Sequence, residues 1–272
     1  MPLTDLIRYF NVADTAGEST LYPDGKRAAA WHRGLRLGSL FQPIVDLRQE
    51  RVVGHQAVLL ARHEDGAAVS AQEAYAACET PESVVHFDRL CRTLHALNFL
   101  AQQQYAGGYL QLSVHPRHLL AIQNQHGLVY EAILKRCGLA PEDIVLHIDT
   151  TAISGQARLA DALANYRQRG YRLALSGPLP ADERLALAPD IVQFASLAQI
   201  GSLEPAHRAG IRIELSGIDD GQTYEQATAA GIDLGQGRLF GRPDVDCRPT
   251  HDKRRVAYNH TSPSGASHEN RQ

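Results

Sequence analysis

Two segments near the start of the chain have the apolar, β-branched character of strands. They are 40–47 (LFQPIVDL) and 52–61 (VVGHQAVLLA), and only the polar stretch RQER separates them. A connection this short cannot hold a helix, and it can join only antiparallel strands. The pattern therefore predicts two adjacent strands, one of which runs against its neighbour.

A helical pattern follows this pair of strands, because apolar residues recur at steps of three or four and mark one buried face. Thr80 is placed to cap this helix, and Pro81 to occupy its first turn. The apolar positions are Val84, Phe87, Leu90, Leu94, Leu97 and Ala101.

The rest of the chain repeats the order of strand and helix. Segments 108–114 and 143–150 have strand character, and helical patterns follow them at 116–138 and 157–170. Three helical segments end in a glycine directly before a strand, where the left-handed conformation closes a helix at no steric cost. These glycines are Gly170, Gly210 and Gly231.

The number of strands indicates the fold class. Eight strand candidates occur in one chain of barrel length, and no GxGxxG opens a helix after the first strand, as a dinucleotide-binding doubly wound sheet would require. We therefore predict an α/β protein, a modified TIM-type (β/α)8 barrel with one antiparallel strand.

Composition divides the chain into three parts. Residues 26–243 are predicted to form the barrel domain, and 1–25, which end in a turn signal, an N-terminal extension. From residue 244 to 272 the apolar periodicity is lost while Ser, His, Pro and charge increase, so we expect a disordered C-terminal tail.

Charge and cysteine content exclude several classes. The net charge of -3 lacks the basic surplus of a protein that binds nucleic acid, so no nucleic acid partner is expected. The four cysteines are widely spaced and form no CxxC pair, which argues against a zinc knuckle or a disulfide framework. Neither a signal peptide nor a run long enough to span a bilayer is present, so we expect a cytoplasmic protein without membrane contact.

Several motifs together resemble the EAL domain of cyclic di-GMP phosphodiesterases. The resemblance runs from about Ala28 to Pro243, and its most specific stretches are FQPIVDL and GQGRLFGRP; GHQAVLL, LQLSVHPRHL, IVLHIDTTAIS and RIELSGIDDG lie between them. It implies a barrel of the modified kind, with the substrate across the C-terminal ends of the strands. It also implies one or two divalent ions in active members, held by carboxylates and an asparagine, because hard cations such as Mg2+ prefer oxygen ligands.

At the positions that the family uses for metal and catalysis, this chain has other residues. Gln56 replaces the glutamate of the family name, and Asp219 alone keeps an acidic group, at the second acidic position of the seventh strand motif. We therefore expect no metal, no cofactor and no intact catalytic site. The other altered positions are Gln111, His147, Thr150, Ser176, Gly177, Gln193, Ala195 and Ser216.

His147 and Asp149 are the remaining candidates for a new metal site. Strand alternation places both on one face, but two ligands are too few, so we interpret them as a polar pair at the barrel mouth. His55 lies next to Gln56 and therefore points away from this face, toward a helix contact. Ser176 has no base partner in a GxSxG context, so a nucleophilic triad has no support.

Nucleotide binding without hydrolysis stays open as an alternative. Gln42 and Gln236 stand at positions that contact the ligand in the family, whereas the phosphate-binding arginine is matched by Leu60, with Arg62 further along the same strand face. The sequence thus predicts a catalytically inactive EAL-like regulator that acts through an unidentified protein partner. The alternatives are a non-hydrolysing receptor with weak cyclic di-GMP binding and residual phosphodiesterase activity.

Overall fold

The computed structural model describes residues 3–13, 19–102, 108–122, 128–153 and 156–248. Its strands form one sheet, in the order β1-β2-β3-β11-β10-β9-β8-β7-β6-β4-β5, and β3 also pairs with β4. The strands are β1 (Ser19–Asp24), β2 (Arg27–His32), β3 (Leu35–Asp46), β4 (Arg51–His63), β5 (Ala68–Val69), β6 (Tyr109–Ser113), β7 (Ile144–Asp149), β8 (Arg172–Ser176), β9 (Ile191–Phe194), β10 (Arg212–Leu215) and β11 (Leu234–Gly235).

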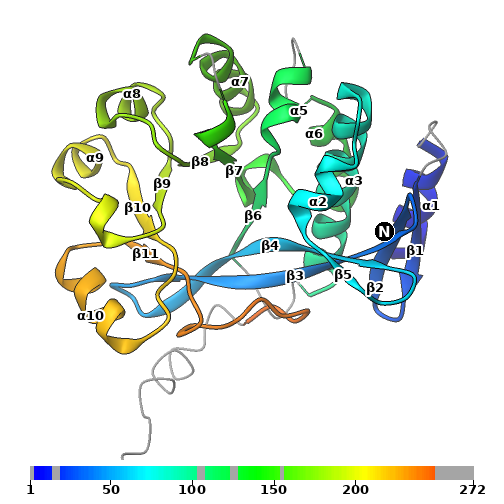
Figure 1. The fold of residues 1–272 in the computed structure, drawn as a ribbon, viewed down its shortest axis with the longest axis horizontal. Helices are drawn as coiled ribbons and strands as arrows, with labels where there is room; N and C mark the ends of the chain where they lie inside the picture. Colours follow the sequence, from blue (N-terminus) through cyan, green and yellow to red (C-terminus); the bar gives the residue numbers. More distant parts are fainter. Residues whose placement is uncertain (1–2, 14–18, 103–107, 123–127, 154–155, 249–272) are drawn as a thin grey trace, which may run out of the picture.

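The pairing of β3 with β4 closes eight of these strands into a barrel. β3 runs antiparallel to both of its barrel neighbours, β4 and β11, whereas the other neighbouring pairs from β4 through β6 to β11 are parallel. The predicted α/β barrel with one antiparallel strand is thus confirmed. The antiparallel strand is the first of the predicted pair, and β3 and β4 form a long ribbon along one side of the molecule (Figure 1).

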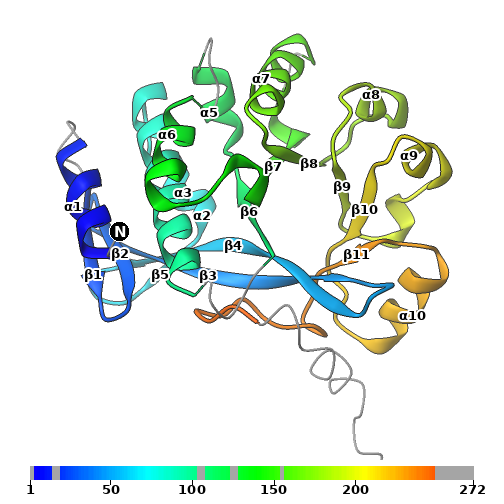
Figure 2. The ribbon, with the colours of Figure 1, turned by 180° about the vertical axis from the view of Figure 1, so that it is seen from behind.

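In Figures 1 and 2 the helices form an arc around the parallel strands, and the β3–β4 ribbon runs along the side that the arc leaves open. Thr80 caps α3 through a reciprocal pair of hydrogen bonds with Ser83, and Pro81 occupies the first turn, as the sequence predicts. Every helix of the described ranges is too short or too polar to cross a membrane. The helices are α1 (Leu3–Ala13), α2 (Ala71–Ala76), α3 (Pro81–Leu100), α5 (Pro116–Ala121), α6 (Leu128–Cys137), α7 (Gln156–Gln168), α8 (Ala181–Ala186), α9 (Glu204–Arg208) and α10 (Gly221–Ala229), with 3-10 turns η1 (Pro141–Asp143), η2 (Thr150–Ala152) and η3 (Leu197–Gln199).

The single helix expected over 116–138 is wrong. Ile122 has an extended backbone with φ -95° and ψ 123°, so α5 ends at Ala121, and α6 begins at Leu128. Periodicity alone cannot reveal such a break, because both helices turn apolar residues toward the same core. By contrast, the three glycines predicted to end helices all have positive φ, between 74° and 88°.

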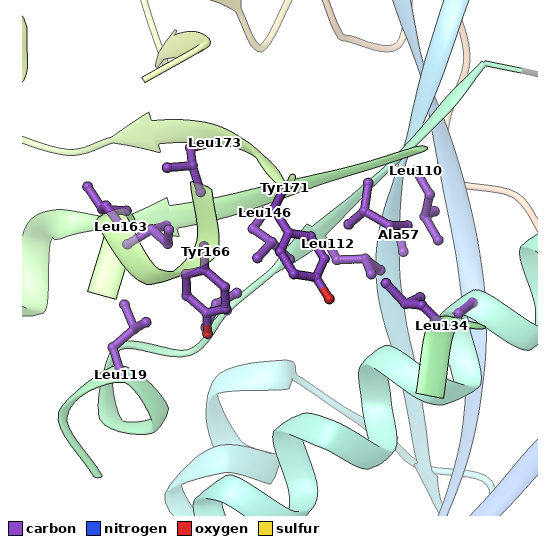
Figure 3. Packing of buried hydrophobic residues seen from close by; sticks show 14 of the residues in the cluster. Ala57, Leu110, Leu112, Leu119, Leu134, Leu146, Leu163, Tyr166, Tyr171 and Leu173 are labelled. Atoms are coloured by element: carbon purple, nitrogen blue, oxygen red, sulfur yellow. The ribbon is translucent and has the colours of Figure 1, made fainter. Parts of the chain in front are cut away.

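The core lies in two layers. Inside the barrel, Tyr109, Val145, Ala174 and Ile191 pack with Ile44 and Leu234. Outside it, a larger cluster joins the strands to the helices, and Figure 3 shows Leu146 and Leu173 facing Leu163 and Tyr166 of α7. Strand alternation, which sends every second side chain inward, therefore fixes which residues reach the barrel interior.

Both ends of the barrel domain are extended by ordered structure. α1 packs on the hairpin β1–β2, which continues the sheet beyond β3. Asp244 pairs with Phe41 of β3 through two backbone hydrogen bonds, and Arg248 donates its backbone N–H to His55. The predicted tail thus begins with a bound strap, residues 244–248; its remainder, 249–272, lies outside the described residues.

Candidate functional site

Several of the altered positions lie inside the barrel, two residues further along their strands than the inner core layer. Gln111, His147, Ser176 and Gln193 each follow by two residues a side chain of that layer. Because side chains alternate along a strand, all four point inward at the C-terminal ends of the parallel strands. Gln42, Gln56 and Gln111 lie opposite one another in the register of β3, β4 and β6.

His147 is a buried, neutral histidine. Burial lowers its pKa to about 4, against the smaller opposing effects of Asp149 and Gln193. Its Nε2 lies 3.0 Å from Ser176 Oγ, and Thr150 Oγ1 donates to the Ser176 carbonyl at 2.8 Å. His147 therefore hydrogen-bonds a hydroxyl rather than Asp149.

Gly177 closes this side of the site. Its φ is +99°, and a Cβ atom here would come within 2.5 Å of Thr150 Oγ1 and 3.0 Å of Asp149 Oδ1. A side chain at this position would require at least the Thr150 side chain to shift. The positive φ of the backbone therefore favours glycine at this position, apart from any loss of a family aspartate.

Amide side chains from β3, β6 and the end of β11 also line the barrel interior. Gln111 is fully buried, and neither its Oε1 nor its Nε2 has a hydrogen-bond partner among the described residues. Gln236 is 4% exposed, and its Nε2 also has no hydrogen-bond partner among the described residues. Gln42, by contrast, donates a hydrogen bond to the Gly241 carbonyl at 3.1 Å. Buried amides without partners are costly, so this region can accept further polar contacts.

Glu214 is an inward-facing residue that the motif comparison missed. It is fully buried on β10, and its Oε1 accepts a hydrogen bond from Gln193 Nε2 at 2.8 Å. Burial raises its pKa to about 7, although Gln193 and Arg212 oppose this shift. The sequence carried a signal for this residue, because polar Arg212, Glu214 and Ser216 alternate with apolar Ile213 and Leu215. The two apolar residues pack in an outer cluster, so the polar ones face inward.

The two aspartates singled out by the sequence do not meet. Asp149 is exposed, and its Oδ1 accepts from the backbone N–H and the hydroxyl of Thr151, which caps η2. Asp219 lies in the loop after β10, where its carboxylate binds Arg238 through the backbone N–H and the guanidinium, each at 2.8 Å. His147 and Asp149, interpreted from the sequence as a polar pair at the barrel mouth, each hydrogen-bond a hydroxyl group, of Ser176 and Thr151 respectively.

The remaining predicted residues have structural contacts. Ser216 Oγ donates to the Phe194 carbonyl at 3.1 Å. His55 points out of the barrel, packs beside Phe99 of α3 and is fully buried, as its expected helix contact requires. Over the described ranges, the side chains of His, Cys, Asp and Glu form no group of three that could hold a metal ion.

The sequence model of the EAL domain matches residues 28–177, more than half of the chain. No curated protein sequence matches the chain. Similar solved structures include the Bacillus subtilis YkuI protein, with an EAL domain, in complex with its substrate cyclic di-GMP and calcium; it is 20% identical, with a TM-score of 0.67 over 82% of this chain and 60% of that one.

Two further solved structures have the same fold. The Klebsiella pneumoniae BlrP1 complex with manganese and cyclic di-GMP is 20% identical, with a TM-score of 0.64 over 76% of this chain and 56% of that one. A standalone EAL protein from Vibrio cholerae in its cyclic di-GMP-bound form is 17% identical, with a TM-score of 0.61 over 80% of this chain and 97% of that one. The chain thus spans less than two thirds of the first two proteins, and at these identities the likeness shows the fold.

Proposed function

The chain belongs to the EAL domain family, and from this membership we propose that it is a regulator that does not hydrolyse cyclic di-GMP and acts through contact with another protein. The observation that carries this proposal is the chemistry of the barrel mouth. Its inward side chains are the amides of Gln56, Gln111 and Gln193, a neutral imidazole, hydroxyl groups and one carboxyl group, Glu214, whose pKa burial raises to about 7.

The donor set does not fit the divalent ion that the family implies. Mg2+ and Mn2+ are held by several anionic oxygens, which also offset their charge. Here Asp149 caps η2 and Asp219 binds Arg238, while Glu214 is biased toward its neutral form by burial. We therefore derive no metal-dependent step for this chain.

A hydrolysis assay tests the absence of activity. Purified protein with Mg2+ or Mn2+ is incubated with cyclic di-GMP, and the linear product is followed by chromatography. The expected result is that the cyclic dinucleotide stays intact in wild type and in Gln56→Ala. Turnover by the wild type that Gln56→Ala abolishes would contradict the proposal.

Cyclic di-GMP binding without hydrolysis is the second candidate, because the amide group of Gln111 and the Nε2 of Gln236 are buried without a partner among the described residues and could contact a ligand. Calorimetric titration with cyclic di-GMP separates this receptor from a scaffold without ligand. A receptor gives a micromolar or tighter complex that Gln42→Ala or Gln236→Ala weakens. A flat titration excludes it and leaves protein contact as the function.

A further inference from the structure

The β3–β4 ribbon carries an exposed face that continues from the barrel mouth. The two strands are 12 and 13 residues long, and they extend beyond the barrel toward β2 and β5 (Figure 1). From Gln42 and Gln56 outward, the same face presents paired side chains of β3 and β4, and Trp31 of β2 follows in register beside Arg36. We call this face the ribbon platform; its members are Trp31, Arg36, Leu40, Val58, Leu60 and Arg62.

The two faces of the ribbon differ in their surroundings. Leu37, Leu59 and Ala61 point to the other face and pack in the cluster under α3, and Ser39 hydrogen-bonds His95 of that helix. In Figures 1 and 2, α2 and α3 lie on one side of the ribbon. Leu40, Val58 and Leu60 on the platform remain only half-buried, and Trp31 is 37% exposed with its ring stacked on Tyr22.

Two arginines lie directly opposite each other on the platform. Arg36 and Arg62 are neighbours in the β3–β4 register, and like charges in this arrangement repel. Arg36 pairs with Asp24 at 2.9 Å, whereas Arg62 donates to the Gly66 carbonyl and has no carboxylate partner among the described residues. Asp24 therefore offsets one of the two charges, and the charge of Arg62 lies on the same face as half-buried aliphatic groups and the exposed ring of Trp31.

We propose that the ribbon platform binds an acidic protein segment that also carries apolar side chains. This inference rests on the proposed function, because it assigns the surface through which a regulator would contact its partner. A carboxylate between Arg36 and Arg62 would relieve their repulsion, and its neighbours would cover Trp31 and Leu60. Tryptophan and arginine are the side chains that most often dominate binding at protein interfaces.

A nucleic acid would meet the same arginines, but the rest of the chain disfavours it. The net charge is -3, so no basic field would attract a phosphate backbone. Leu40 and Val58, which lie opposite each other next to Gln42, add an aliphatic surface that a peptide can cover. The platform is therefore assigned to a protein partner.

Trp31 supplies an internal probe, because it is the only tryptophan of the chain. The titrant is a peptide of about eight residues in which every second residue is in turn glutamate or leucine, with serine between them, so that both kinds of side chain lie on one face in extended form. Binding is expected to shift Trp31 emission to shorter wavelength and to protect it from acrylamide. Arg62→Gln should weaken the binding at least about fivefold, and added salt should weaken it in the wild type.

Arg208→Gln is the matched control, because this exposed arginine pairs with Glu204 on α9, at the opposite end of the molecule. It should leave the peptide affinity unchanged. The proposal is overturned if emission does not change at millimolar peptide, or if a lysine–leucine peptide or a single-stranded oligonucleotide of equal length binds as well. An equal affinity of Arg62→Gln also overturns it, whereas hydrolysis of cyclic di-GMP would contradict only the proposed function.

Discussion

Glu214 is a carboxyl group without contact with water, and its protonation is coupled to folding. Its side chain is fully buried, one oxygen accepts from Gln193, and the other has no partner among the described residues. Burial raises its pKa from 4.5 to about 7. The folded protein therefore holds a proton here that the unfolded chain releases at lower pH, and stability falls as pH rises from about 4.5 to about 7.

Glu214→Gln removes this titration while it keeps an oxygen that can accept from Gln193. We expect the variant to be more stable than wild type at pH 8, by on the order of 3 kcal/mol, and equal to it near pH 4.5. Urea unfolding of both proteins at several pH values measures the difference. A constant difference across this range would show that Glu214 is ionised in the folded protein at pH 5 and refute the prediction.

The comparison must be a difference between the two proteins, because buried histidines act in the opposite direction. Burial lowers the pKa of His55, His95 and His147 to about 4. Each contributes stability that is present above the unfolded pKa of 6.5 and is lost as pH falls toward 4. These histidines are the same in wild type and Glu214→Gln, so their contribution cancels in the difference.

At the scale of elements, the strap of residues 244–248 differs from the disordered tail that the sequence predicts from residue 244. It fills the edge of β3 between the residues that pair with β2 and those that pair with β11. Gln102 bridges it through its side chain, donating to the Val245 carbonyl and accepting from Cys247 N–H, and His55 accepts from Arg248 N–H. These contacts join β3, β4 and the end of α3.

A chain that ends at Pro243 lacks the strap, and we expect it to unfold at lower urea concentration than a chain that ends at Arg248. Each lost hydrogen bond costs about 1 kcal/mol, partly offset by the freedom of the unbound segment, so a loss on the order of 2 kcal/mol is expected. The chain that ends at Arg248 is the control, since it keeps the hydrogen bonds of the strap. Equal stability of the two shortened chains would mean that the strap contributes nothing.

The sequence predicted elements where the local pattern carried the information. The turn RQER forced the antiparallel pair β3–β4, and Gly170 ended its helix because only glycine adopts φ +88° without strain. The strap could not be predicted, because its contacts with Phe41 and Gln102 connect residues far apart in the chain. The contacts of Asp219 with Arg238 have the same origin, since a loop residue shows no periodicity.

At the scale of the whole molecule, closure of the barrel depends on space between β4 and β6. Gly54 lies opposite Tyr109 in their register, and the Tyr109 ring is buried within the barrel, with the Arg172 guanidinium 4.8 Å from its centre. A Cβ atom at Gly54 would lie 2.7 Å from Tyr109 Cε2, closer than two carbon atoms can approach. The long ribbon can therefore join the parallel strands only with glycine at this position, unless the ring moves.

Gly54→Ala should accordingly destabilise the protein by about 2 kcal/mol or more in urea unfolding, because the confined ring must leave its position. The gain from a stiffer unfolded chain, about 0.5 kcal/mol, offsets only part of this. In a Tyr109→Leu background the obstruction is gone, so Gly54→Ala should cost little, and the double-mutant cycle should give a coupling of about 2 kcal/mol. Gly38→Ala in the same ribbon is the control, since its Cβ atom would meet Leu60 at an ordinary 3.5 Å. If Gly54→Ala costs the same in both backgrounds, the Tyr109 ring is not what requires glycine at the closure of the barrel.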